Sequence, residues 1–158
     1  MTTETPLNLK IREIEFRTHA HATESIEKVK ICLKKILPAD FKDSDFDMQN
    51  LAGTYGNPIR AIIAKVDTQA SIKSVLDALS KNITSETKTI LNQEFENRLD
   101  EKFRFYFRLD KQLLTLNKVE TTNDSDVVRI TIAFQNKNPK SKPTVDDFRK
   151  ILQDFQLL

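Results

Sequence analysis

Hydrophobic and polar residues alternate strictly along the segment from residue 103 to residue 110. In an extended chain, one side would carry Phe103, Phe105, Phe107 and Leu109, and the other Arg104, Tyr106, Arg108 and Asp110. A period of two with many aromatic residues is typical of a half-buried strand. The pattern therefore predicts a strand over 102–109 whose apolar side is covered by helices. Its opposite side would present two guanidinium groups around a phenol.

Three other segments show strand patterns. Residues 7–22 alternate, but the apolar residues before Glu13 have the opposite parity to Ile14 and Phe16, which predicts a bulge near Glu13. Residues 43–66 are typical of a β-hairpin, because the segment 51–58 between its two halves holds both glycines of the chain and so allows a turn with positive φ. Residues 128–134 alternate again and predict a further strand.

Apolar residues at helical spacing predict the remaining elements. We expect a helix from Thr23 to Pro38, two consecutive helices over 70–100, one helical turn over 111–116 and a C-terminal helix capped by Thr144. This order of elements is of the α+β type. It predicts a mixed, mostly antiparallel sheet with helices packed on one face and the other face partly open. The length suits a single domain over 1–158, with residues 1–6 flexible.

Composition limits the functions that the chain can perform. The 25 Lys and Arg residues nearly balance the 23 Asp and Glu residues, so the net charge is +2. A nucleic-acid site would therefore need local clustering of basic residues. The single cysteine, Cys32, excludes an internal disulfide and a zinc site with several cysteines. The sequence has no signal pattern and no apolar run long enough for a membrane span, so we expect a cytoplasmic protein without membrane contact.

Candidate binding residues gather on the polar sides of the predicted strands. They are Arg17, His19 and His21 on the first strand, Arg104, Tyr106 and Arg108 on a later one, and Arg129 on the last. If these strands are neighbours, they form a basic surface with interleaved aromatic groups, which suits phosphate contact and base stacking. The alternative is an ordinary solvated face on which Glu13, Glu15 and Asp110 pair with the arginines.

Catalytic and metal-binding patterns are weak. His19 and His21 form an H-x-H pair, but no third ligand can be identified. The sequence has no G-x-S-x-G elbow and no glycine-rich phosphate loop. We therefore predict a protein that is not an enzyme, with no cofactor and no metal site.

Three segments together resemble an archaeal family described as RNA-binding proteins or exosome subunits. They are residues 11–24, residues 51–59 (Leu-Ala-Gly-Thr-Tyr-Gly-Asn-Pro-Ile) and residues 100–112, which include Lys-Phe-Arg-Phe-Tyr-Phe-Arg-Leu-Asp-Lys. The resemblance implies an α+β fold similar to that of the ribosomal protein that binds the small rRNA of the large subunit. It also implies RNA contact at the motif positions whose side chains suit RNA: Arg17, His19, His21, Tyr55, Asn57, Arg60, Arg104, Tyr106, Arg108 and Lys111.

The leading hypothesis is a non-catalytic RNA-binding protein in RNA processing or ribosome-associated roles. Its open sheet face and its Gly-Asn-Pro turn would meet structured RNA, with ribosomal RNA as one candidate. Phosphate contacts would come from Arg17, Arg104, Arg108 and Arg129, and stacking or hydrogen bonds from Tyr106, His19 and Tyr55. Exosome or ribosome-associated proteins are candidate protein partners. The alternative is an accessory subunit of a larger RNA-processing complex that docks proteins and does not touch RNA.

Overall fold

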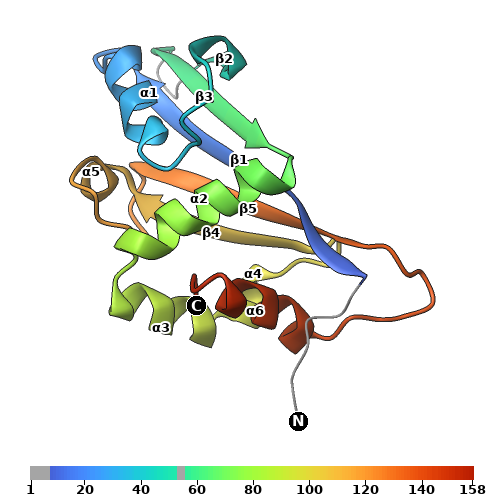
Figure 1. The fold of residues 1–158 in the computed structure, drawn as a ribbon. Coiled ribbons are helices and arrows are strands. Elements are labelled where there is room, and N and C mark those ends of the chain that lie inside the picture. Colours follow the sequence, from blue (N-terminus) through green and yellow to red (C-terminus); the bar gives the residue numbers. More distant parts are fainter. Residues whose placement is uncertain (1–7, 53–55) are drawn as a thin grey trace.

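Five strands form one antiparallel sheet in the computed structural model, which describes residues 8–52 and 56–158. The strands are β1 (Leu9–His21), β2 (Asp47–Ala52), β3 (Pro58–Val66), β4 (Arg104–Asp110) and β5 (Val127–Asn136). Their order is β2-β3-β1-β5-β4, so the long β1 lies at the centre (Figure 1). All four pairings in the sheet are antiparallel, and the α+β fold class is confirmed.

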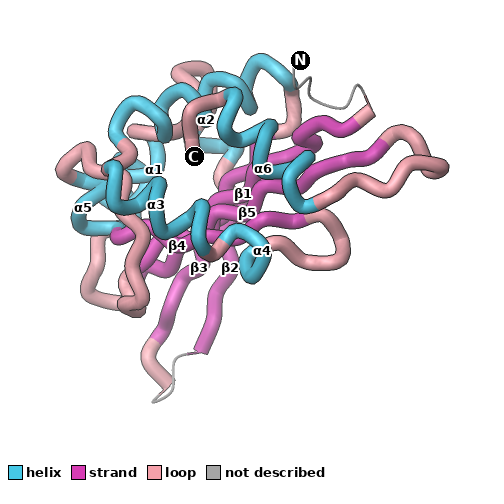
Figure 2. The backbone as a smooth tube through the Cα atoms, turned by 90° about the horizontal axis from the view of Figure 1, so that it is seen from below, coloured by secondary structure: helices cyan, strands magenta, loops and turns pink. Residues whose placement is uncertain are grey.

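Six α-helices accompany the sheet in the part of the chain that the structure describes. They are α1 (Ile26–Lys34), α2 (Gln69–Asn82), α3 (Ser85–Gln93), α4 (Phe95–Arg98), α5 (Lys111–Thr115) and α6 (Val145–Asp154). Figure 2 shows that α1, α2, α3 and α6 gather on one side of the sheet, which leaves the other side without a helical layer. None of the helices in the described ranges is long and apolar enough to cross a membrane.

Local hydrogen bonds explain where the helices begin. Thr68 and Thr144 cap α2 and α6, each with a capping box, as the sequence predicts for Thr144. The first helix begins at Ile26 and not after Thr23, because the side chain of Ser25 accepts from the backbone N–H of Lys28. The two helices expected over 70–100 are three, since the chain leaves helical geometry at Ile83 and again at Glu94.

The predicted irregularity in the first strand is present. The pairing of β1 with β5 shifts register between Ile11 and Glu13. Because of this bulge, Ile11 and Ile14 both face the core although they are three residues apart. At the other end of the sheet, Gly56 has φ of 77° where the hairpin enters β3, as the glycine content of this turn suggests. Residues 1–6, which we expected to be flexible, and Tyr55, which we expected to contact RNA, lie outside the described ranges.

The core lies between the sheet and its helices and is rich in phenylalanine. Phe105 and Phe107 of β4 are completely buried, and the ring of Phe105 stacks on that of Phe95 from α4 with centroids 4.7 Å apart. Phe103 departs from the predicted strand. Its φ is 64°, because the carboxylate of Asp100 accepts from the backbone N–H groups of Lys102 and Arg104 and folds the chain into a turn. The strand therefore begins at Arg104.

The opposite face of the sheet is divided into a basic part and an apolar part. On β3 this face carries Ala61 and Ile63, which are buried among their neighbours. On β1, β5 and β4 it carries the polar residues that alternate with the core residues. Apart from Lys65 of β3, which lies opposite Glu15, the basic side chains of this face are therefore on the three strands at one side of the sheet.

Candidate functional site

Three arginines lie side by side across the open face. In the pairing of β1 with β5, Arg17 is directly opposite Arg129, and in the pairing of β5 with β4, Arg129 is directly opposite Arg108. Adjacent strands are about 4.8 Å apart, so the three Cα atoms span roughly 10 Å. We call Arg17, Arg129 and Arg108 the arginine row. The sequence predicted that these residues share a face, and the strand order makes them neighbours.

The arginine row has no acidic partner among the residues that the structure describes. None of its three guanidinium groups forms an ion pair or a side-chain hydrogen bond there. Glu15 lies opposite Lys65 and Thr131, and Asp110 accepts from the N–H of Leu113 to cap α5. Asp124 lines a hollow together with the row but forms no ion pair with it. Like charges placed directly opposite each other destabilise a sheet. The fold therefore holds three adjacent positive charges at a cost in stability.

Tyr106 stands next to the row and is held firmly. Its hydroxyl donates to Asp100 Oδ2 at 3.0 Å, and Arg104 Nε donates to the same oxygen at 3.0 Å. The guanidinium carbons of Arg104 and Arg129 lie 5.7 and 6.0 Å from the centre of the phenol ring, within cation–π range. The charge of Arg104 is thus partly satisfied by Asp100, while that of Arg129 is not.

Titration behaviour follows from this network. Partial burial alone would raise the pKa of Asp100, but hydrogen bonds from the Arg104 backbone and the Tyr106 hydroxyl outweigh it and hold that pKa below its usual value. Burial, and then the hydrogen bond to Asp100, raise the pKa of Tyr106. The phenol of Tyr106 therefore remains neutral over the physiological pH range and donates a hydrogen bond to the carboxylate of Asp100.

The two histidines of β1 lie on the same face beyond Arg17. Partial burial first, and then the positive charge of Arg17, lower the pKa of His19, with smaller contributions from His21, Lys111 and Arg129. His19 is therefore neutral at pH 7. His21 lies at the end of the strand, where its Nε2 is 3.9 Å from a carboxylate oxygen of Glu24.

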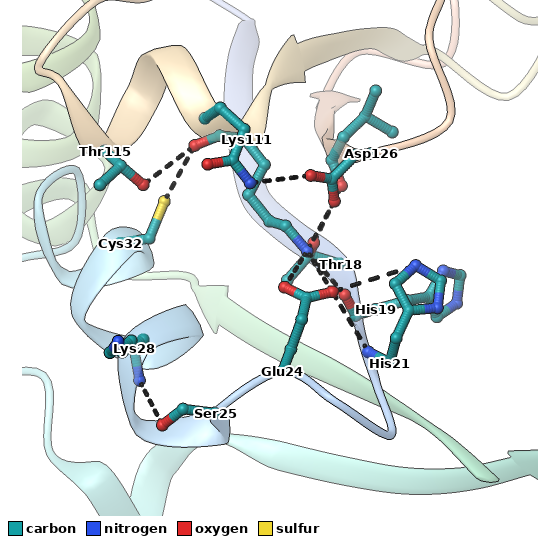
Figure 3. Close-up of polar contacts among 12 residues, drawn as sticks. Thr18, His19, His21, Glu24, Ser25, Lys28, Cys32, Lys111, Thr115 and Asp126 are labelled. Atoms are coloured by element: carbon teal, nitrogen blue, oxygen red, sulfur yellow. Dashed lines mark hydrogen bonds and ion pairs between the residues drawn. The ribbon is translucent and has the colours of Figure 1, made fainter.

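Lys111 is buried at the end of the sheet, where it contacts the last residues of β1 and the residue before β5. Only 3% of the residue is exposed. Its ammonium group lies 3.0 Å from Glu24 and 2.8 Å from Asp126, and it donates to the backbone carbonyl of His19 at 2.9 Å (Figure 3). These contacts join the end of β1 to α5 and to the start of β5. RNA contact at this position stays a prediction; in the free protein the ammonium group is already paired with two carboxylates.

Lys111 also contacts two residues of a candidate metal-ligand group. The ligand atoms of His21, Glu24 and Asp126 lie within 4.8 Å of one another, and they form the one such group found in the described ranges. The ammonium group of Lys111 already binds both carboxylates, and it supplies the positive charge that a cation would bring. The arrangement is that of an ion-pair cluster in which a buried ammonium group joins two partly exposed carboxylates.

The remaining predicted residues lie away from the row. Asn57 and Arg60 are exposed near the start of β3. Arg60 lies opposite Ala20, whose side chain faces the helices, so its side chain starts on the opposite side of the sheet from Arg17. Both residues lie next to the hairpin turn and line neither hollow beside the row.

Two hollows border the arginine row on the open face. One has a volume of about 380 Å³ and is lined by Tyr106, Arg108 and Arg129 together with residues of α4 and the loop before β5. The other, of about 250 Å³, is lined by Arg17, His19, Arg108 and Arg129 together with Asp124, Ser125 and Val127. The 380 Å³ hollow adds Asn97, Arg98 and Asn123, which no periodic pattern in the sequence distinguishes from ordinary surface residues.

Solved structures share this fold. Protein AF2318 from Archaeglobus fulgidus has a TM-score of 0.73 at 22% identity, covering 92% of this chain and 99% of its own. The DUF54 protein Mth689 from Methanothermobacter thermautotrophicus has a TM-score of 0.70 at 24% identity, covering 90% and 98%. At these identities the likeness concerns the fold alone.

Comparison of sequences identifies the family of the chain. RNA-binding protein PAB1135 from Pyrococcus abyssi is 31% identical over 147 residues, which cover 92% of this chain and 96% of that protein. The model of a family described as RNA binding matches residues 13–134, and this description names no enzymatic activity. The matched range contains all five strands except the ends of β1 and β5 and includes the whole arginine row. The chain therefore belongs to this RNA-binding family, as the motifs in its sequence led us to expect.

Proposed function

We propose that the protein is a non-catalytic RNA-binding protein that meets RNA with the open face of β1, β5 and β4. The observation that carries the proposal is the arginine row, whose three adjacent guanidinium groups have no acidic partner among the described residues. Contacts to phosphates supply most of the affinity of such proteins and fix the position of the nucleic acid. A phosphate backbone laid across the row would relieve the repulsion between the three charges.

The neighbouring groups take different parts in this proposal. Tyr106 is fixed by its hydrogen bond to Asp100, so it offers a rigid aromatic surface beside the row. Arg104 is a weaker phosphate contact, because Asp100 already accepts from it. His19 supplies a neutral imidazole that can donate or accept a hydrogen bond. Asn57 and Arg60 would form a second contact beside the hairpin turn.

We further propose that the ligand is structured RNA and that the protein acts in the cytoplasm, in RNA processing or in association with the ribosome. The support for a structured ligand is the geometry of the face, which is built on strands and not on loops. Strands hold their side chains at fixed spacing, so they match a backbone of defined shape better than a flexible one.

Fluorescence anisotropy across a salt series tests the proposal. The wild type should bind a labelled structured RNA with a steep decrease in affinity as salt increases. The double variant Arg108→Ala/Arg129→Ala should weaken binding and lower the slope of log K against log salt by about 1.4 to 1.8, at 0.7 to 0.9 per lost phosphate contact. Lys81→Ala/Lys118→Ala is the charge-matched control, since both lysines are exposed and neither lines the hollows beside the row.

Two results would count against the proposal. If both double variants reduce affinity and slope equally, binding depends only on total charge and not on the row. If the wild type binds neither structured nor single-stranded RNA at low salt, the face does not bind RNA. In that case an acidic protein surface would become the better candidate for the arginine row, as expected for an accessory subunit of a larger complex.

A further inference from the structure

The 380 Å³ hollow at the β4 end of the arginine row has the size of a small ligand pocket. Its volume lies near the lower end of the usual range of about 300 to 1,000 Å³. It is too small to take a nucleic-acid helix and suits a single nucleotide. The larger cavity of the protein, of about 450 Å³ between α1 and α5, is separate from it and includes no residue of the row.

One wall of the hollow is built from flat side chains. Tyr106 lines it with its ring held in place by Asp100, and Arg129 lies over that ring at 6.0 Å. Arg108 lines the hollow from the neighbouring position of the row. Nucleobases stack on phenol rings and on guanidinium planes alike. A base entering this hollow would thus meet a flat and positively charged surface.

The rim of the hollow carries two free carboxamides. Asn97 comes from α4 and Asn123 from the loop before β5, so they approach from separate parts of the chain. Both residues are exposed, and neither makes a side-chain hydrogen bond to any residue within 8–52 or 56–158. A carboxamide offers a donor and an acceptor next to each other, which matches the edge of a base. By contrast, Asp100 and Arg98 in the same hollow are already engaged, Arg98 with Glu94.

We infer that this hollow receives one unpaired nucleotide of the bound RNA. The base stacks against the Tyr106 and Arg129 wall, its edge is hydrogen-bonded by Asn97 and Asn123, and the adjoining phosphates lie on the arginine row. This inference rests on the proposed RNA binding and adds the class of ligand. The preferred RNA carries a bulged or looped-out nucleotide beside a helical segment, because the row and the hollow are adjacent and share Arg108 and Arg129.

A pair of matched RNA hairpins tests the inference. The two hairpins differ only in a single bulged 2-aminopurine nucleotide, which is present in one and absent from the other. Binding of both hairpins is measured by anisotropy across a salt series and compared at equal salt, and the environment of the bulged base is followed by 2-aminopurine fluorescence. The protein variants are Asn97→Ala/Asn123→Ala and the control Gln93→Ala, which alters an exposed residue of α3 that does not line the hollow. Thermal melting verifies that each variant is folded.

The wild type should bind the bulged hairpin about tenfold more tightly than the paired one, a difference that one base-edge contact can supply. It should also change the 2-aminopurine fluorescence on binding. The Asn97→Ala/Asn123→Ala variant should lose most of the preference, whereas Gln93→Ala should keep it. Equal binding of both hairpins by the wild type, or a preference unchanged in the double variant, would overturn the inference. A steep salt dependence on the paired hairpin would then still support the arginine row, while absence of binding to either RNA would overturn both.

Discussion

Removing the central charge of the arginine row should make the free protein more stable. In Arg129→Gln, the like-charge contacts with Arg17 on one side and Arg108 on the other both disappear. Directly opposed cross-strand charges contribute about 0.2 to 1 kcal/mol each. Two such contacts in the lower half of that range amount to about 1 kcal/mol of relieved repulsion. Loss of the contact between Arg129 and the Tyr106 ring removes about 0.5 kcal/mol, so the expected net gain is about 0.5 kcal/mol.

Urea denaturation followed by circular dichroism measures this gain. The comparison variant is Arg60→Gln, because Arg60 is also an exposed strand arginine, but it lies opposite Ala20 and Asn50 and has no like charge across the strand. The gain in Arg129→Gln should shrink between 0.05 and 1 M salt, since the screening length falls to about 3 Å at 1 M. A loss of stability at low salt, or a gain that salt does not change, would refute the view that the row is held at an electrostatic cost.

Three further predictions concern the surroundings of the row. Lys111→Met should reduce the free energy of unfolding by about 2 kcal/mol in chemical denaturation, because it leaves the partly buried carboxylates of Glu24 and Asp126 without their partner. Phe107→Ala should cost about 3 to 5 kcal/mol in the same assay, since Phe107 is fully buried. RNA should raise the lowered pKa of His19, because a nearby phosphate favours the charged imidazole. The affinity for RNA should therefore increase as the pH falls from 7.5 to 5.5, and it should increase less in His19→Gln. NMR titration of the His19 ring with and without RNA measures the pKa shift directly.

Local patterns were sufficient to predict which side of each strand a residue occupies. The alternation over 128–134 and around Arg17 assigned Arg129 and Arg17 to the polar side, and the register confirms it. The opposition of Arg17, Arg129 and Arg108 in a single row could not be predicted, because it depends on the strand order. That order brings together strands that are far apart in the sequence, such as β1 and β5, and no local period encodes it.

Departures from the sequence prediction have local or distant causes that can be named. Phe103 leaves the strand because the backbone N–H groups of Lys102 and Arg104 donate hydrogen bonds to the carboxylate of Asp100, and this local turn overrides the alternation pattern. A lysine such as Lys111 is usually exposed. Here its ammonium group is paired with the carboxylates of Glu24 and Asp126, which are 87 and 15 residues away in the sequence. Asn97 and Asn123 come together from α4 and a loop, so only the folded chain makes them part of one hollow.

Mapping of the RNA-bound surface by NMR tests the central claim most directly. At 18.3 kDa the protein is suited to amide and arginine Nε–Hε chemical-shift titration with a structured RNA. The account predicts that the largest shifts occur at the side chains of Arg17, Arg108 and Arg129 and at outward-facing amides of β1, β5 and β4. Shifts confined to the helical side, on α2 and α6, with the arginine row unchanged, would contradict it.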